Sequence, residues 1–198
     1  MKIGGMKSKN LLRPASYQLI PLLKLLHNNL NAVLISDGVG VGKTISAGYI
    51  LVYIIAKYKK PAIVVCPPSL LEKWKNELEL KFQLHAEIIS SVDEFWTMES
   101  ELLAKIKNRV DTVYILPSSM LHTMKLDEKI KLSAIVFDEI HNFRNKETRG
   151  YADAKEIATH ADYKIGLSAT PVNNSLDDLV SEFSILLSDY SWDAINMT

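Results

Sequence analysis

The chain has 198 residues, of which 47% are hydrophobic and 23% charged, ordinary values for a globular protein. This composition excludes a disordered chain, a collagen-like chain and a low-complexity linker. The 23 basic and 23 acidic residues give a formal net charge of zero, so the chain lacks the strongly basic composition typical of nucleic-acid-binding proteins.

Short segments rich in β-branched residues alternate with longer segments of helical spacing. The short segments are apolar at consecutive positions, as parallel strands covered on both faces are. We predict strands at Ala32–Ser36, Ala62–Cys66, Ala86–Ser90, Thr112–Leu116, Ala134–Asp138 and Tyr163–Leu167. We predict helices at Ser16–Asn28, Lys43–Tyr58, Ser69–Phe82, Glu94–Asn108, Thr148–Thr159 and Ser175–Leu187. The alternation predicts a layered α/β domain with a mostly parallel sheet and helices on both faces.

The number of cysteines and the length of the longest apolar stretch exclude several classes of protein. Cys66 is the one cysteine, which excludes a disulfide framework and a cysteine-based structural metal site and favours a cytoplasmic protein. The longest apolar stretch, Ile45–Ala56, is far shorter than the roughly 20 residues of a membrane span, so we expect no membrane partner. We expect residues 1–10 to be a disordered or tag-like segment and residues 11–198 to form one domain.

A glycine-rich loop joins the first predicted strand to the second predicted helix. Its sequence is Asp37-Gly38-Val39-Gly40-Val41-Gly42-Lys43-Thr44. Glycines let the backbone curl so that several N–H groups point at one anion, and the helix N-terminus adds partial positive charge. We expect Lys43 to reach the β- and γ-phosphates of a nucleotide and Thr44 to place its hydroxyl on Mg²⁺. Asp37 departs from the general P-loop pattern, which has glycine there.

Two adjacent carboxylates, Asp138 and Glu139, follow a fully apolar strand. Ligands of open α/β sheets bind at such strand ends. In a P-loop enzyme Asp138 would hold the Mg²⁺ that Thr44 binds, and Glu139 would orient and deprotonate the attacking water. His141 has no second histidine or cysteine at ligand spacing, so a polar relay near the nucleotide is favoured over a metal site.

These and further motifs resemble the first motor lobe of the superfamily-two helicase-like ATPases, the Swi/Snf type in particular, with features of the bacterial RapA-like branch. The glycine-rich loop is similar to that family's D-E-x-G-x-G-K-T, and Asp138–His141 resembles its D-E-A-H box with isoleucine in place of alanine. Ser168–Leu176 and the block Pro67–Leu78, with its S-L-L-x-x-W core, also match family patterns. The resemblance implies a single RecA-like P-loop NTPase domain that uses ATP and Mg²⁺.

The resemblance also implies roles for individual residues. Tyr17, Gln18 and Arg13 would contact adenine, and the nucleotide phosphates would be held by Gly38, Gly40, Val41, Gly42, Lys43 and Thr44. Nucleotide state would be coupled to the nucleic acid by His141, Ser168, Ala169 and Thr170. The DNA backbone would be contacted by Ser69, Lys73, Ser118 and Ser119.

Two of these assignments have alternatives in which the residues bind no ligand. Ser69 followed by Glu72 also fits a plain helix-capping box. Lys73, Lys75 and Trp74 could line the DNA track, or they could form a solvated basic helix face with one buried tryptophan.

The function that the resemblance implies is the ATP-binding lobe of a DNA-dependent ATPase that moves on double-stranded DNA, working with a second RecA-like lobe. The alternatives are the motor lobe of an RNA helicase or of a restriction-type translocase, and a non-catalytic nucleic-acid docking module. The retention of Lys43, Thr44, Asp138 and Glu139 argues against the last of these.

We expect these 198 residues, assayed alone, to hydrolyse ATP slowly even when DNA is present. Enzymes of this family take arginines for the γ-phosphate from the second lobe, and an arginine finger raises the rate by about 10³–10⁵. A steady-state phosphate-release assay checks this. Turnover at ordinary enzyme rates, about 1–10³ s⁻¹, would contradict the expectation.

Overall fold

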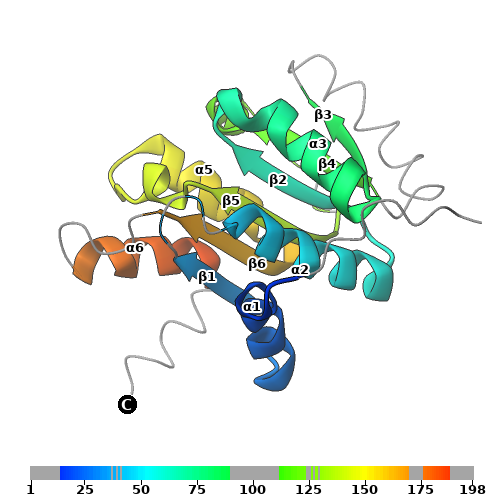
Figure 1. Cartoon of the computed structure of the whole chain (residues 1–198). Helices are drawn as coiled ribbons and strands as arrows, with labels where there is room; N and C mark the ends of the chain where they lie inside the picture. The colour runs from blue at the N-terminus through cyan, green and yellow to red at the C-terminus, as the bar shows by residue number, and fades with distance from the viewer. Residues whose placement is uncertain are drawn as a thin grey trace, which may run out of the picture.

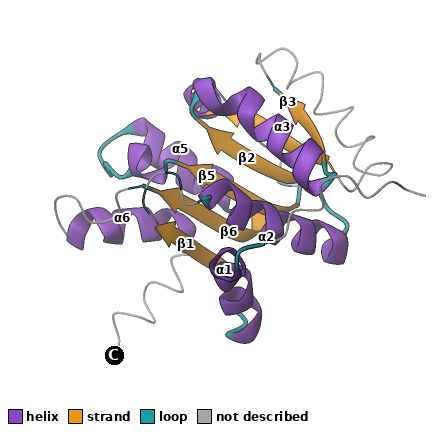
Figure 2. Cartoon of the chain, in the orientation of Figure 1, coloured by secondary structure: helices purple, strands orange, loops and turns teal. Residues whose placement is uncertain are grey.

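The computed structural model describes residues 14–36, 38, 40, 42–89, 112–123, 126, 128, 130–169 and 176–187. Six strands in this part of the chain form one sheet (Figures 1 and 2). They are β1 (Ala32–Ser36), β2 (Ala62–Cys66), β3 (His85–Ile88), β4 (Thr112–Pro117), β5 (Leu132–Asp138) and β6 (Ala161–Ser168). The strand order is β1-β6-β5-β2-β4-β3, and all five neighbouring pairs are parallel.

Five α-helices accompany the sheet in the described ranges. They are α1 (Ser16–His27), α2 (Lys43–Tyr58), α3 (Leu71–Phe82), α5 (Arg149–Ala158) and α6 (Leu176–Leu186). Three short 3₁₀ turns follow strand ends: η1 (Pro68–Leu70), η2 (Ser118–Thr123) and η3 (Ile140–Phe143). The predicted strands and five of the predicted helices are confirmed, with ends that shift by up to two residues. The predicted helix at Glu94–Asn108 and residues 1–10 lie outside the described residues.

The sheet carries a separate hydrophobic core on each face. Alternate residues of β2, which is buried throughout, belong to different cores because successive side chains of a strand point to opposite faces. Ile63 and Val65 pack in the core that includes α5 and α6, whereas Val64 packs in the core that includes α1, α2 and α3. Helices therefore cover both faces of the sheet, as a parallel sheet requires.

Helix α3 lies against α2 at a position where only glycine fits. A Cβ built on Gly48 would lie 2.2 Å from Cε2 of Phe82. The Phe82 ring also meets the Tyr49 ring edge to face, with centroids 5.2 Å apart. This close approach fixes the spacing of the two helices that border the candidate site described below.

The start of α3 differs from the prediction. The structure begins the helix at Leu71, and the predicted capping by Ser69 is absent. The preceding residues form the 3₁₀ turn η1, in which the N–H groups of Leu70 and Leu71 already donate to the carbonyls of Pro67 and Pro68. Ser69 is exposed within this turn.

Helix α6 buries an acidic side chain. Glu182 is 0% exposed, and neither of its carboxylate oxygens has a hydrogen-bond partner among the described residues. Burial raises the pKa of Glu182 from its ordinary value of 4.5 to about 7, against the opposing effect of the Arg144 charge. The folded chain thus binds this proton more tightly than the unfolded chain does.

Stability should therefore fall as pH rises from about 4.5 to about 7. The contribution of Glu182 is fully present below its unfolded pKa of 4.5 and is lost once pH exceeds its folded pKa of about 7, a change of about 3 kcal/mol for this shift. Glu182→Gln should flatten the dependence of the free energy of unfolding on pH over this range, measured by urea denaturation. The exposed Glu147→Gln is the control. An unchanged slope in Glu182→Gln would contradict the assignment.

Candidate functional site

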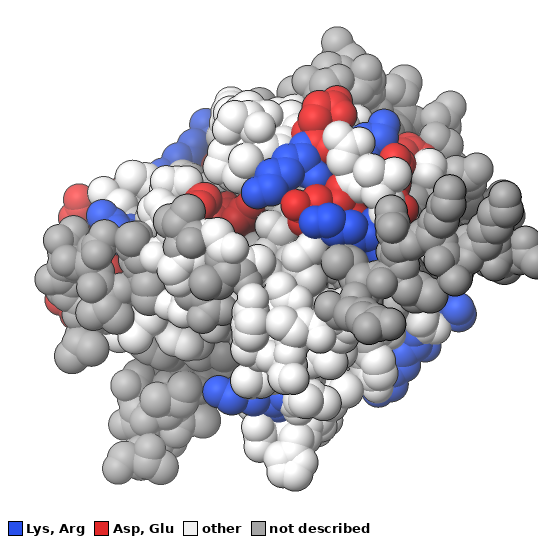
Figure 3. Space-filling view, in the orientation of Figure 1, with Lys and Arg blue, Asp and Glu red and all other residues white. Residues whose placement is uncertain are grey.

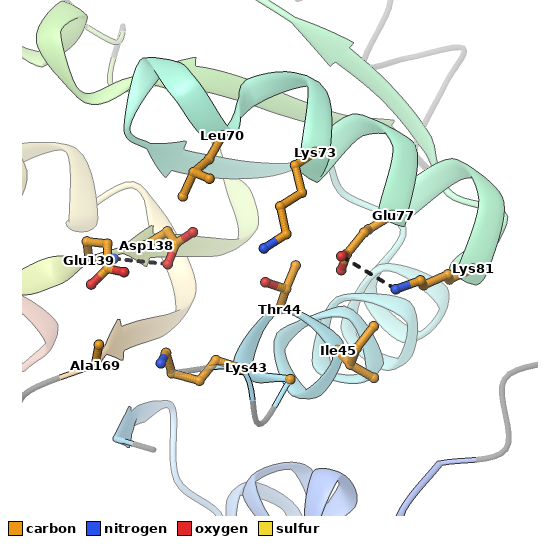
Figure 4. Close-up of a pocket in the computed structure, with 12 residues that line it drawn as sticks. Lys43, Thr44, Ile45, Leu70, Lys73, Glu77, Lys81, Asp138, Glu139 and Ala169 are labelled. Carbon is orange, nitrogen blue, oxygen red and sulfur yellow. Dashed lines mark hydrogen bonds and ion pairs between the residues drawn. The ribbon is translucent and has the colours of Figure 1, made fainter. Parts of the chain in front are cut away.

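The candidate site lies at the carboxyl edge of the sheet. A cavity of about 390 Å³ opens there between α2, α3 and the ends of β5 and β6 (Figure 4). It is lined by Gly40, Gly42, Lys43, Thr44, Ile45, Leu70, Lys73, Glu77, Lys81, Asp138, Glu139 and Ala169. The glycine-rich loop, the carboxylate pair and the end of β6, which lie far apart in the sequence, therefore share one cavity.

The glycine-rich loop adopts a backbone that most residues avoid. Gly40 and Gly42 have φ angles of +87° and +89°, in the left-handed region that favours glycine. The side chain of Gln18, on α1, packs against Gly42, because a Cβ built there would lie 2.7 Å from its Nε2. The Gln18 Oε1 accepts a hydrogen bond from the Ala15 N–H at 3.1 Å, so the start of α1 is joined to the loop.

The two residues that begin α2 face the cavity from beneath. The Lys43 Nζ donates to the carbonyl of Gly38 at 3.3 Å, which holds the ammonium within the loop that we expect to bind phosphate. Thr44 lines the same cavity as Asp138. The loop and both side chains are thus arranged around one space at a helix N-terminus, where anions are favoured.

Asp138 is buried at the end of β5. It is 6% exposed, and each of its carboxylate oxygens accepts a hydrogen bond. Oδ2 accepts from the indole Nε1 of Trp74 at 2.8 Å, and Oδ1 accepts from the Glu139 N–H at 3.0 Å. Burial raises the pKa of Asp138, while the Trp74 hydrogen bond and the nearby charge of Lys73 act in the opposite direction.

Glu139 has a strained backbone next to this buried group. Its φ of +53° lies in the left-handed region, which costs a non-glycine residue about 1–3 kcal/mol and is found preferentially at functional sites. Its Oε2 lies 3.3 Å from the Nδ1 of His141, on the turn η3. The structure therefore brings the predicted relay histidine beside the predicted base.

Lys73, which we expect on the DNA track, also lines the cavity. Its side chain points toward the space between Thr44 and Asp138 (Figure 4). The cause is helical spacing: Lys73, Glu77 and Lys81 are four residues apart, so they share the face of α3 that lines the cavity. Lys81 pairs with Glu77 at 3.4 Å, and basic and acidic side chains gather together over α3 (Figure 3).

The remaining predicted residues do not line this cavity in the described part of the chain. Tyr17 is 51% exposed and lines a smaller cavity of about 230 Å³ beside β1. Ser168 is fully buried, and its hydroxyl has no hydrogen-bond partner in the described part of the chain. Ser118 and Ser119 follow β4, which is the parallel neighbour of β2, so they lie at the same carboxyl edge of the sheet as Ser69. Arg13, Val41 and Thr170 lie outside the described residues.

Sequence reasoning missed the link between α3 and the carboxylate pair. Trp74 is 1% exposed, which confirms the reading of this residue as buried, but no motif indicated that its N–H reaches Asp138. The tryptophan itself could have indicated a polar contact, because a buried indole N–H needs a hydrogen-bond acceptor.

The chain is similar to known proteins over most of its length. A family model described as the SNF2-related domain matches residues 18–195, which is most of the chain. The chain belongs to the SNF2-related domain family. Among curated members, a zebrafish (Danio rerio) protein described as a SWI/SNF-related, matrix-associated, actin-dependent regulator of chromatin is 31% identical over 183 residues. That match covers 89% of this chain and 19% of the zebrafish protein.

A bacterial relative is also longer than this chain. The Bacillus subtilis protein described as the uncharacterized ATP-dependent helicase YqhH is 26% identical over 174 residues, covering 87% of this chain and 29% of that protein. This SNF2-related chain therefore spans less than a third of the length of either relative.

A solved structure confirms the fold. The Sulfolobus solfataricus SWI2/SNF2 ATPase core, described as in complex with double-stranded DNA, superposes with a TM-score of 0.72 at 22% identity. The match covers 91% of this chain and 37% of that one. The predicted RecA-like α/β fold is thus confirmed, and the SNF2-related chain has the fold of the part of that core that it matches.

No group of three or more histidine, cysteine or acidic side chains within the described ranges could hold a metal ion by itself. No helix in that part of the SNF2-related chain is long and apolar enough to cross a membrane.

The loop geometry predicts a graded response to alanine. Gly42→Ala combines a left-handed φ with a clash against Gln18, Gly40→Ala has the left-handed φ without the clash, and Gly38→Ala has neither. We expect Gly38→Ala to leave the melting temperature unchanged, and the other two to lose about 1–2 kcal/mol or more, with Gly42→Ala the least stable. Thermal unfolding measures this order, and equal stability of all three would refute the loop geometry.

Proposed function

We propose that this chain is the ATP-binding lobe of a DNA-dependent ATPase that couples hydrolysis to movement on double-stranded DNA. The observation that carries the proposal is the single cavity shared by Lys43, Thr44, Asp138 and Glu139. These are the groups that phosphoryl transfer requires of a protein, because that reaction depends on positioning and on neutralising charge.

The donor set in the cavity suits Mg²⁺ bound together with a nucleotide. Thr44 offers a hydroxyl and Asp138 a carboxylate with one lone pair left on each oxygen, and Mg²⁺ prefers few protein ligands completed by phosphate oxygens and water. Thr44 and Asp138 would hold the ion, which when bound neutralises charge on the phosphates.

The other residues act directly on the nucleotide and the water. The loop N–H groups and Lys43 would bind the phosphates, for which Lys43 must leave its bond to the Gly38 carbonyl. Glu139 would orient the attacking water and accept its proton at a carboxylate oxygen. Its contact with His141 would keep that carboxylate turned toward the cavity. Gln18 and Tyr17 would contact the base from α1.

We assign the DNA-binding surface to the turns that follow β2 and β4. Ser69, Ser118 and Ser119 would contact the DNA backbone there. Ser168, Ala169 and Thr170 would couple this surface to the cavity. We favour double-stranded DNA over RNA because the structurally similar Sulfolobus core is described with that ligand. A second RecA-like lobe would close the cleft and supply arginines.

Lys43→Ala tests the proposal. ATP with Mg²⁺ should raise the melting temperature of the parent chain in a concentration-dependent way, because a ligand that binds only the folded state stabilises it. Lys43→Ala should remove most of this shift while keeping the melting temperature without ligand, since the residue begins α2 and the bond from its ammonium to the Gly38 carbonyl is exposed. Lys60→Ala, which breaks an exposed pair with Asp162, is the matched control.

The outcome that contradicts the proposal is an equal ATP response in parent and Lys43→Ala. In a polypeptide that carries both lobes, ATPase activity should rise with double-stranded DNA and not with RNA, and Lys43→Ala should abolish it. A rise with RNA alone would point to an RNA helicase, and no ATP response in any form would point to a docking module.

A further inference from the structure

One hydrogen bond joins α3 to the carboxylate that we place on Mg²⁺. The Trp74 Nε1 donates to the Asp138 Oδ2 at 2.8 Å. The two residues are 1% and 6% exposed and lie 64 positions apart in the sequence. The bond is therefore a buried, charge-assisted contact between two separate elements, and such bonds are stronger than those between neutral groups.

The two oxygens of Asp138 are held by donors of different origin. The Glu139 N–H, from the turn after β5, binds Oδ1, and the Trp74 indole, from the first turn of α3, binds Oδ2. Two donors at fixed positions define the plane of the carboxylate and leave one lone pair on each oxygen. Rotation of the side chain would break both bonds.

The indole is well suited to this task. It only donates, it carries no charge, and it does not titrate, so it does not compete with the carboxylate for a cation. Its ring belongs to the hydrophobic core beneath α3, with Leu78 among its members, which holds the N–H in place. Lys73, the residue before it, lines the cavity and contributes charge instead.

We propose that Trp74 is a positioning residue, whose indole N–H orients the Asp138 carboxylate for the Mg²⁺ that accompanies ATP. The inference rests on the proposed function, since it assumes that Asp138 binds that ion. The Trp74 bond connects α3 to the phosphate site. The turn η1, which contains the exposed Ser69 that we place on DNA, leads into the same helix.

Core packing alone would not require this arrangement. A phenylalanine would fill most of the same space without bringing a polar N–H into the core, where an unpaired donor is costly. The pairing of the one polar atom of the ring with the one carboxylate at the end of β5 is what distinguishes a positioning role from a packing role.

Trp74→Phe separates these two roles. It keeps an aromatic ring in the core and removes the donor to Oδ2. Calorimetric titration of ATP into the variant, at increasing Mg²⁺, should give a Mg²⁺ midpoint about 10–100-fold higher than that of the parent. ATP affinity in EDTA should stay unchanged, because the loop and Lys43 are intact. Tyr163→Phe, which removes a hydroxyl bonded to Tyr58 elsewhere, should behave as the parent in both conditions.

The outcomes distinguish this inference from the proposed function. If ATP binding by the parent does not respond to Mg²⁺, the metal assignment fails and this inference fails with it. If the parent responds and Trp74→Phe has the same Mg²⁺ midpoint, the role of Trp74 alone is refuted. If the affinity in EDTA falls in parallel with that in Mg²⁺, Trp74 is a packing residue and the inference is wrong.

A second measurement applies if Trp74→Phe does not fold. In the parent chain labelled with ¹⁵N at the indole, the Trp74 N–H resonance should shift when Mg²⁺ is added with ATP and shift less with ATP in EDTA. It should also shift in Asp138→Asn, which weakens the acceptor. A Trp74 resonance that responds to neither change would overturn the proposal.

Discussion

The buried carboxylate of Asp138 is the constraint on which the site depends. Removing an ionised carboxylate from water costs several kcal/mol unless hydrogen bonds and charges compensate it. The parallel sheet provides the position, because β5 is a central strand that ends at the edge where β1, β2 and β6 also end. The Trp74 and Glu139 donors and the Lys73 charge provide the compensation. A cation bound beside Thr44 would complete it.

The geometry around Asp138 explains why α3 must lie close to α2. The glycine at position 48 allows Phe82 to approach, and this brings the Trp74 N–H within reach of β5 and the Lys73 side chain into the cavity. Packing against α2 at one end of α3 and polar contacts with the cavity at the other end thus belong to the same helix.

Much of the fold could be predicted because its signals are local. Runs such as Ala62–Cys66 are apolar at every position, which is typical of strands covered on both faces. The glycine-rich loop before Lys43 indicates a strand–turn–helix unit. A parallel sheet then places Asp138 and Lys43 at the same edge, but the strand order that brings them into one cavity comes from the structure. The family resemblance carried by these motifs is confirmed by the SNF2-related match.

The remaining features depend on contacts between distant residues. The bond between Trp74 and Asp138 spans 64 positions, and the orientation of Lys73 depends on where α3 begins. Ser69 fits a capping pattern, but the 3₁₀ bonds of η1 use the donors that it would have capped. Glu182 reads as an ordinary charged residue of an amphipathic helix, and only the packing of α6 shows that it is buried. Local patterns do not show which distant residue completes such a contact.

We propose that a nucleotide-bound divalent cation sits beside Asp138, within reach of α3. Replacing Mg²⁺ by paramagnetic Mn²⁺ and recording the ¹⁵N indole resonances of the folded chain tests this position. We expect Mn²⁺ with ATP to broaden the Trp74 resonance strongly, and Lys43→Ala, which weakens nucleotide binding, to restore it. A sharp Trp74 resonance in the presence of saturating Mn²⁺ and ATP would show that the cation lies elsewhere.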